Sequence, residues 1–214
     1  MFKILESENN CDALGLMITK GVTDFFLPEA VKPILLKSLM WLETSTTNFH
    51  IVDVDPIRRL ASLIQTNKAG VDAISDRLKL SNKKRQKLKD LVEPRWQATW
   101  NINENKLRAL FYQFGPAYIV DLVFLEWSRT LNEKNQLTKG ETDGWLHIIE
   151  TADGWTMPEF PVRGQDLLDL NVKEGPRISN LLNLVEDWWR DGGCHADRTA
   201  CLEKLKQCFS YVLV

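Results

Sequence analysis

The stretch Pro161–Trp188, PVRGQDLLDLNVKEGPRISNLLNLVEDW, predicts a short helix, a tight turn and a second helix that begins at Gly175-Pro176. Proline suits a first helical position because its missing N–H would have no partner there, and the preceding glycine lets backbone approach closely. Arg177 follows beside exposed N–H groups that favour an anion. Gly175 and Arg177 are therefore candidate phosphate contacts, as in a helix-hairpin-helix. The alternative is a helical corner without a ligand.

Helical periodicity also dominates the rest of the chain, which predicts an all-α fold. Many expected helices start with proline in the first turn, or after Asp, Ser or Asn. The turn-rich segment Met157–Gly164 is expected to divide a helical body, residues 1–156, from a smaller helical tail, residues 157–214. The expected helices are Asp12–Lys20, Pro28–Leu42, Pro56–Gln65, Val71–Leu78, Asn82–Val92, Glu104–Phe114, Ala117–Leu131, Pro176–Trp189 and Asp197–Leu213.

Composition is that of an ordinary globular protein. The 214 residues are 44% hydrophobic and 26% charged, which suffices for a core, and the formal net charge is −2. No apolar run reaches the roughly 18–20 residues that cross a bilayer, and residues 1–10 do not resemble a signal peptide. Four cysteines in such a chain favour reduced thiols. We therefore expect a cytoplasmic protein without a membrane partner.

Positive charge is concentrated in one segment of the chain. Residues 53–90 carry ten Lys or Arg against five Asp, although the whole chain is slightly acidic. Half of these bases lie on one expected helix, with Ser81 as its N-cap and with Leu88 and Leu91 facing inward. Such a helix can lie along an RNA backbone and release counterions; the alternative is a solvated helix face. The five bases are Lys83, Lys84, Arg85, Lys87 and Lys89.

The segment Pro161–Trp188 resembles the tail motif of bacterial CCA-adding tRNA nucleotidyltransferases and their poly(A) polymerase relatives. That motif runs G-x-D-L, then a turn ending in G-P, then a leucine-rich helix. Leu167–Leu170 and Glu174–Ile178 are similar to it. Asn171 and Ser179 depart from the pattern, because the family's tail often has glycine at these places.

Two earlier segments resemble the same family, in the family's order. Leu16–Glu29, which follows Phe2–Leu5, is similar to the segment after the neck of those enzymes. Asp55–Leu63 and then Arg77–Asn82 resemble the start of their helical body. The chain is accordingly expected to begin inside the helix that ends the neck.

The catalytic head of that family has no counterpart in this sequence. The head carries a Gly-Ser turn and two aspartates on a strand, which bind metal ions, whereas Gly15, Gly21 and Gly70 are not followed by Ser. The neck's nucleotide-reading helix is not matched either. The resemblance thus implies a body and tail with no catalytic residue and no cofactor, since Mg²⁺ and ATP or CTP belong to the head. Whether the chain is an enzyme stays open, and we expect it to be inactive alone.

The resemblance implies that the chain holds the acceptor arm and elbow of tRNA, with a separate head and neck chain as a further partner. It does not distinguish CCA addition from poly(A) addition. The alternative function is a catalytically inert helical protein-interaction scaffold, or a relic of a split enzyme, with an exposed apolar patch near the N-terminal end. The candidate RNA contacts are Arg58, Arg59, Lys83, Lys84, Arg85, Lys87, Gly175 and Arg177.

Two other groups of side chains have alternative interpretations. Asp53 and Asp55 could be a pair of metal-binding carboxylates, but Asp55-Pro56 is more typical of a helix start. A cluster of three cysteines and His195 could bind zinc, yet its seven-residue spacings suit one face of a helix better than a zinc site. We therefore expect a cap at Asp55, and we expect Cys201 and Cys208 to face the core of the last helix. The third cysteine of the cluster is Cys194.

Overall fold

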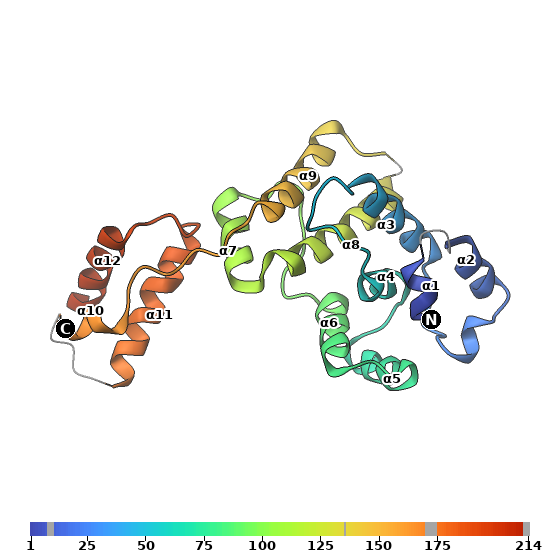
Figure 1. Ribbon diagram of the computed structural model, residues 1–214, viewed down its shortest axis with the longest axis horizontal. Helices are drawn as coiled ribbons and strands as arrows, with labels where there is room; N and C mark the ends of the chain where they lie inside the picture. The colour runs from blue at the N-terminus through green and yellow to red at the C-terminus, as the bar shows by residue number, and fades with distance from the viewer. Residues whose placement is uncertain (8–10, 135, 170–174, 212–214) are drawn as a thin grey trace. The chain divides into compact units, whose positions relative to one another are not determined.

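A computed structural model describes residues 1–7, 11–134, 136–169 and 175–211, and these residues form an all-α fold (Figure 1). This confirms the predicted fold class. A 3₁₀ turn, η1 (Thr23–Phe25), and an isolated antiparallel bridge between Ala30 and Ile64 accompany the helices. The α-helices are α1 (Phe2–Glu6), α2 (Cys11–Thr19), α3 (Pro33–Ser45), α4 (Pro56–Leu63), α5 (Lys68–Leu78), α6 (Asn82–Val92), α7 (Glu104–Phe114), α8 (Pro116–Lys134), α9 (Lys139–Asp153), α10 (Gly164–Asp169), α11 (Pro176–Asp191) and α12 (Arg198–Tyr211).

Local capping signals explain why several helix bounds were predictable. Helices α6 and α7 have the predicted bounds, and each begins after a side chain that caps the first turn. Ser81 accepts a hydrogen bond from the N–H of Lys84, and Asn103 accepts from the first turn of α7. Gly115, at φ 81°, ends α7, and Pro116 opens α8. Among the described residues, no helix is long and apolar enough to cross a membrane.

Two helix predictions were wrong. Helix α3 begins at Pro33, not at Pro28, because the residues before it are tied to the end of α4: the N–H groups of Val31 and Lys32 both donate to the carbonyl of Leu63. Helix α9 was missed, although it carries a capping box in which Thr138 and Glu141 satisfy each other's backbone N–H. The expected turn after α10 and the end of the last predicted helix, Leu213, lie outside the described residues.

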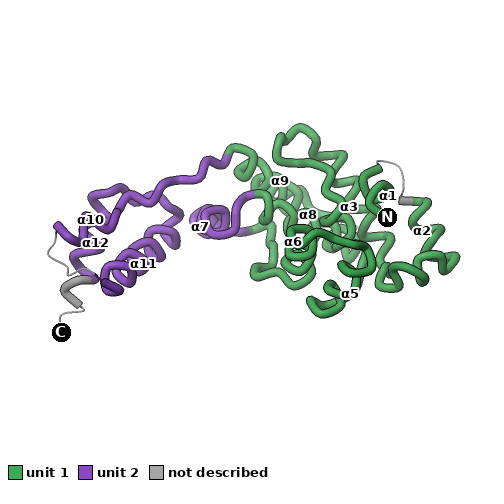
Figure 2. The backbone as a smooth tube through the Cα atoms, turned by 60° about the horizontal axis from the view of Figure 1, so that its bottom comes forward, with its two compact units in different colours: residues 1–101, 117–154 green, residues 102–116, 155–214 purple. Residues whose placement is uncertain are grey.

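The helices fall into two compact units (Figure 2). Unit 1 comprises residues 1–101 and 117–154, and unit 2 comprises residues 102–116 and 155–214. Helix α7 thus groups with the tail helices, although it lies far from them in the sequence. The expected division at residue 156 stays a prediction, since close packing does not show which part folds alone.

Side chains of α7 explain its place in unit 2. The Arg108 Nε–H donates to the carbonyl of Gly193 at 2.8 Å, and the Tyr112 hydroxyl donates to Glu186 at 2.6 Å. Tyr112 also meets Trp189 edge-on, with ring centroids 5.2 Å apart. Gly193 has a φ of 76°, and a Cβ there would lie 2.7 Å from Asn105 Oδ1, so a side chain would collide with α7. These contacts fix α7 against the tail.

The core of unit 2 includes the cysteines. Cys201 is fully buried beside Trp189 and Leu205, and Cys208 packs against the same cluster. The expectation that these two cysteines face the core is therefore confirmed. Over the part of the chain that the structure describes, no group of three or more His, Cys, Asp or Glu side chains is placed to hold a metal ion.

The interior of unit 1 is built around buried charges. Helix α4 is enclosed on nearly every side, so Arg58 and Arg59 are each only 2% exposed. Glu43 of α3, 3% exposed, accepts from both: its Oε1 lies 2.6 Å from Arg58 Nη2, and its Oε2 lies 2.7 Å from Arg59 Nε. Buried charges are tolerated only when they are paired in this way.

The same network extends to three more helices. Arg58 donates to Asp121 of α8 at 2.8 Å and lies over the Phe124 ring at 4.7 Å. Arg59 donates to the carbonyls of Leu5 and Ser7, which fixes the end of α1. Lys87 of α6 contacts Asp121 at 2.6 Å. We call Glu43, Asp55, Arg58, Arg59, Lys87 and Asp121 the buried charge network.

Replacement of Glu43 by glutamine should destabilise unit 1 strongly. The change leaves two buried guanidinium groups without their shared carboxylate, which typically costs about 3–5 kcal/mol. Urea denaturation measures the change in the free energy of unfolding. Glu150→Gln is the matched control, because Glu150 lies at an exposed site on α9. The free energy of unfolding of this variant should stay within about 0.5 kcal/mol of the value for the parent protein. A Glu43→Gln protein as stable as this control would show that the network is not needed.

Candidate nucleic-acid interface

Two of the predicted RNA contacts lie in the interior, which corrects the prediction. The side chains of Arg58 and Arg59 are enclosed by the buried charge network and are not accessible to a phosphate backbone. A signal in the sequence could have shown this. Glu43 and Asp121 each interrupt an apolar helical run, and a buried acid in such a run requires a basic partner.

The basic helix α6 presents its charges on different sides. Leu88 and Leu91 are buried, as predicted. Lys87 was expected to share an exposed face with Lys84, but it is half-buried, and its Nζ lies 2.6 Å from the carboxylates of Asp55, the N-cap of α4, and Asp121 of α8. The expected single basic face is therefore wrong at Lys87, because Asp55 and Asp121 engage this side chain.

Two further bases of α6 are neutralised by the neighbouring helix α5. Lys89 lies 2.7 Å from Asp72, and Arg85 contacts both Asp72 and Asp76. The hydrogen bond from Lys89 is the main reason why the pKa of Asp72 lies below its ordinary value. Arg85 is half-buried, so this predicted RNA contact is already engaged within the protein.

The exposed positive charge that remains gathers where α5 meets α6. We define the basic turn as Lys79, Lys83 and Lys84, all of which are exposed. Lys79 ends α5 in the left-handed conformation, at φ 54°, and Ser81 then caps α6. Among the described residues, no ion pair involves any of the three lysines; Lys84 instead lies over the ring of Phe2 at 4.6 Å. Lys79 thus lies in the turn that leads to α6, and Lys83 and Lys84 lie in the first turn of α6, near the positive end of its dipole.

The basic turn is the part of the predicted interface that can meet an anion directly. Lys83 and Lys84 were predicted RNA contacts, and the structure leaves both on the surface. Lys79 was not predicted, although it lies within the same basic segment. Figure 1 shows α5 and α6 next to each other, and the three lysines of the basic turn are exposed to solvent.

In unit 2, the start of α11 has the geometry that the sequence predicted. Gly175 is the N-cap, at φ 132° and ψ −167°, and Pro176 follows at the first helical position. A non-glycine residue would be strained at this φ. Gly175 and Arg177 are both exposed. The preceding turn lies outside the described residues, so the predicted phosphate contacts at Gly175 and Arg177 stay a prediction.

Asp55 is a helix cap, as predicted. Its Oδ1 accepts from the N–H groups of Ile57 and Arg58 at 2.8 and 2.9 Å, and its Oδ2 contacts Lys87 at 2.6 Å. Burial tends to raise the pKa of Asp55, but the bonds from Lys87 and the Arg58 N–H outweigh it and hold that pKa below its ordinary value. Burial likewise opposes the charge on Lys87, yet Asp121 and Asp55 raise its pKa.

The chain is similar to known proteins over part of its length. No protein-family profile matches the chain. The chain is 35% identical over 75 residues to the "Uncharacterized 28 kDa protein in petA 5'region" of Rhodospirillum rubrum, covering 35% of this chain and 29% of that protein. It is 24% identical over 159 residues to "CCA tRNA nucleotidyltransferase 1, mitochondrial" of Danio rerio, covering 74% of this chain and 34% of that protein. The matches thus span about a third of each relative. The second agrees with the resemblance noted above.

Asp55→Asn tests the link between the α4 cap and α6. Asparagine still caps a helix, so the variant removes mainly the charge that faces Lys87. Because the folded pKa lies below 3.8, Asp55 stabilises the fold above that pH and loses this effect as the pH falls through the folded pKa. We expect the free energy of unfolding to fall by about 1 kcal/mol at pH 7, the size of a typical intramolecular hydrogen bond, and the loss to shrink in acid.

Urea denaturation at pH 7 and in acid measures this difference. Asp143→Asn, on the exposed surface of α9, provides the matched loss of one negative charge. A deficit of Asp55→Asn that persists unchanged in acid would show that the charge on Asp55 is not its cause.

Proposed function

We propose that this chain binds tRNA as the body and tail of a nucleotidyltransferase of the CCA-adding and poly(A) polymerase family. It would hold the acceptor arm and elbow through backbone contacts while a catalytic head adds nucleotides to the 3′ end. Such recognition depends on the shape of the RNA more than on its sequence. The proposal assigns catalysis, Mg²⁺ and ATP or CTP to the head, which a separate chain could supply, and places the binding in the cytoplasm.

The basic turn is the observation that carries the proposal. The whole chain has a net charge of −2, so binding to RNA cannot rest on overall charge. Lys79, Lys83 and Lys84 provide a local concentration of exposed positive charge, while the other bases of α6 are engaged by carboxylates. The distant similarity to a CCA tRNA nucleotidyltransferase supports RNA as the anion. Gly175 and Arg177 are proposed as a second backbone contact, on unit 2.

The double variant Lys83→Gln/Lys84→Gln should weaken tRNA binding without unfolding the protein, since both side chains are exposed. The logarithm of the affinity falls with the logarithm of the salt concentration, and each lost phosphate contact lowers that slope by about one. We therefore expect a slope reduced by roughly two. Titration of labelled tRNA at several salt concentrations between about 50 and 200 mM measures it.

Lys20→Gln/Lys139→Gln is the matched control, because it removes the same charge from exposed positions on other parts of unit 1. An unstructured RNA of equal length shows whether the shape of tRNA matters. If the two double variants bind tRNA equally well, the basic turn is not the interface. If the parent protein does not prefer tRNA, the proposed function is wrong.

A specific observation also favours the second candidate, a catalytically inert scaffold or relic that binds a protein. Among the residues that the structure describes, six of the eleven exposed large hydrophobic residues lie between positions 16 and 41. Phe25 is 91% exposed, and Ile34 and Trp41 of α3 are 64% and 60% exposed. Exposed apolar surface of this kind is typical of interaction sites.

Phe25→Ser/Ile34→Ser should abolish such a protein contact while leaving the salt dependence of tRNA binding unchanged.

A further inference from the structure

One lysine of the basic turn has an aromatic partner. The ammonium group of Lys84 lies over the ring of Phe2, with its Nζ 4.6 Å from the ring centroid. Phe2 belongs to α1 and Lys84 to the first turn of α6, so two distant parts of the chain meet at the basic turn. The negative face of an aromatic ring attracts a cation in this position. The contact therefore limits where this exposed lysine can place its charge.

The helix that carries Phe2 is fixed to the interior of unit 1. Helix α1 packs against α4, and Leu5 of α1 is only 1% exposed. Arg59 of the buried charge network donates through Nη1 to the carbonyls of Leu5 and Ser7, at 2.6 and 3.0 Å. These bonds hold the end of α1 against α4, and Phe2 lies on the same short helix. The ring of Phe2 is therefore a fixed support for a lysine on the surface.

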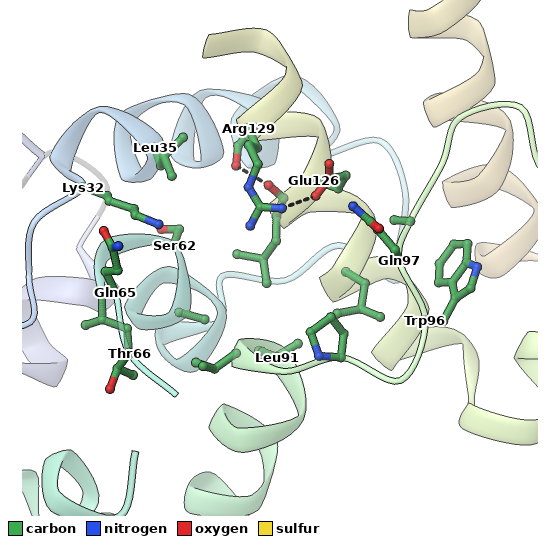
Figure 3. A pocket seen from close by; sticks show the side chains of 18 residues that line it. Lys32, Leu35, Ser62, Gln65, Thr66, Leu91, Trp96, Gln97, Glu126 and Arg129 are labelled. Atoms are coloured by element: carbon green, nitrogen blue, oxygen red, sulfur yellow. Dashed lines mark hydrogen bonds and ion pairs between the residues drawn. The ribbon is translucent and has the colours of Figure 1, made fainter. Parts of the chain in front are cut away.

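Two other lysines of unit 1 lack such a support. Figure 3 shows Lys32 beside Ser62 and Gln65, at the edge of a groove of about 400 Å³. Among the residues that the structure describes, no ion pair or aromatic ring engages Lys32 or Lys83. A lysine side chain without a partner samples many rotamers and loses this freedom when a ligand orders it. Lys84 has lost part of that freedom before any ligand binds.

We propose that Phe2 is a positioning residue for RNA binding, which holds the Lys84 ammonium group where a phosphate of the RNA backbone can contact it. An ammonium group has three N–H donors, and a phosphate oxygen can accept from those that point away from the ring. The ring has no formal charge, so it orders the lysine without neutralising it. Lys87 and Lys89 differ, since their ammonium groups lie 2.6 and 2.7 Å from carboxylates. The inference rests on the proposed function, because RNA is the ligand.

Phe2→Leu removes the aromatic ring and keeps an apolar side chain at this position. We expect tRNA to bind about threefold more weakly, the size of a cation–π contact at an exposed site. The dependence of binding on salt should stay that of the parent protein, because Lys84 keeps its charge. Phe2→Tyr keeps an aromatic face and should bind tRNA like the parent protein. Titration of labelled tRNA at several salt concentrations measures both quantities, and thermal melting verifies that each variant is folded.

A double-mutant cycle separates the positioning of Lys84 from a general effect on the fold. In a Lys84→Gln protein, Phe2→Leu should no longer weaken tRNA binding, because no ammonium group is left to position. In a Lys83→Gln protein, Phe2→Leu should still weaken binding by about threefold. Lys83 is the matched control, since it is an exposed lysine in the same turn of α6. Equal losses in the two proteins would overturn the proposal, as would a Phe2→Leu protein that binds tRNA as tightly as the parent protein.

NMR spectra of the free protein test the contact without RNA. The ring current of Phe2 should shift the signals of the protons next to the Lys84 ammonium group upfield, and Phe2→Leu should remove this shift. Unshifted signals in the parent protein would also overturn the proposal. Failure of the proposed function is a separate result. A parent protein that binds tRNA and an unstructured RNA equally well would disprove the preference for tRNA, and the cycle would then be measured on either RNA. A parent protein that binds neither RNA would overturn both proposals.

Discussion

The fold of unit 1 depends on the constraint that Arg58 and Arg59 cannot be buried without carboxylates. Glu43 forms ion pairs with both guanidinium groups, and Asp121 forms a second ion pair with Arg58. Burial disfavours the charge on Arg58, but these two acids outweigh that effect and raise the pKa of Arg58. Because the partners come from α3, α4 and α8, the charges specify how these helices meet, in a way that interchangeable apolar contacts would not.

The same constraint decides which bases reach the surface. Lys87 completes the network by contacting Asp55 and Asp121. An ion pair therefore holds α6 against the rest of unit 1, together with the buried side chains of Leu88 and Leu91. Acids on α5 neutralise Arg85 and Lys89. Positive charge is left exposed at one end of α6, where the chain turns. The basic residues between positions 53 and 90 look alike in the sequence, but in the structure they have different roles. Some belong to the buried charge network, and others form the exposed basic turn.

The basic turn combines exposed ammonium groups with the positive end of the α6 dipole. Such a surface suits phosphates without regard to the base, because neither feature distinguishes one base from another.

The sequence by itself determined the all-α class, the bounds of α6 and α7, the caps at Asp55 and Ser81, and the inward leucines of α6. These features depend on residues close together in the chain, so local periodicity and capping suffice to predict them. Only the tertiary structure decided that Arg58 and Arg59 are interior, that Lys87 points inward, and that α7 belongs to unit 2. Each of these depends on a partner far away in the sequence: Glu43, Asp121 and Gly193. A lysine or arginine has the same charge on a surface and in a core, and its burial is settled only when folding brings a carboxylate to it.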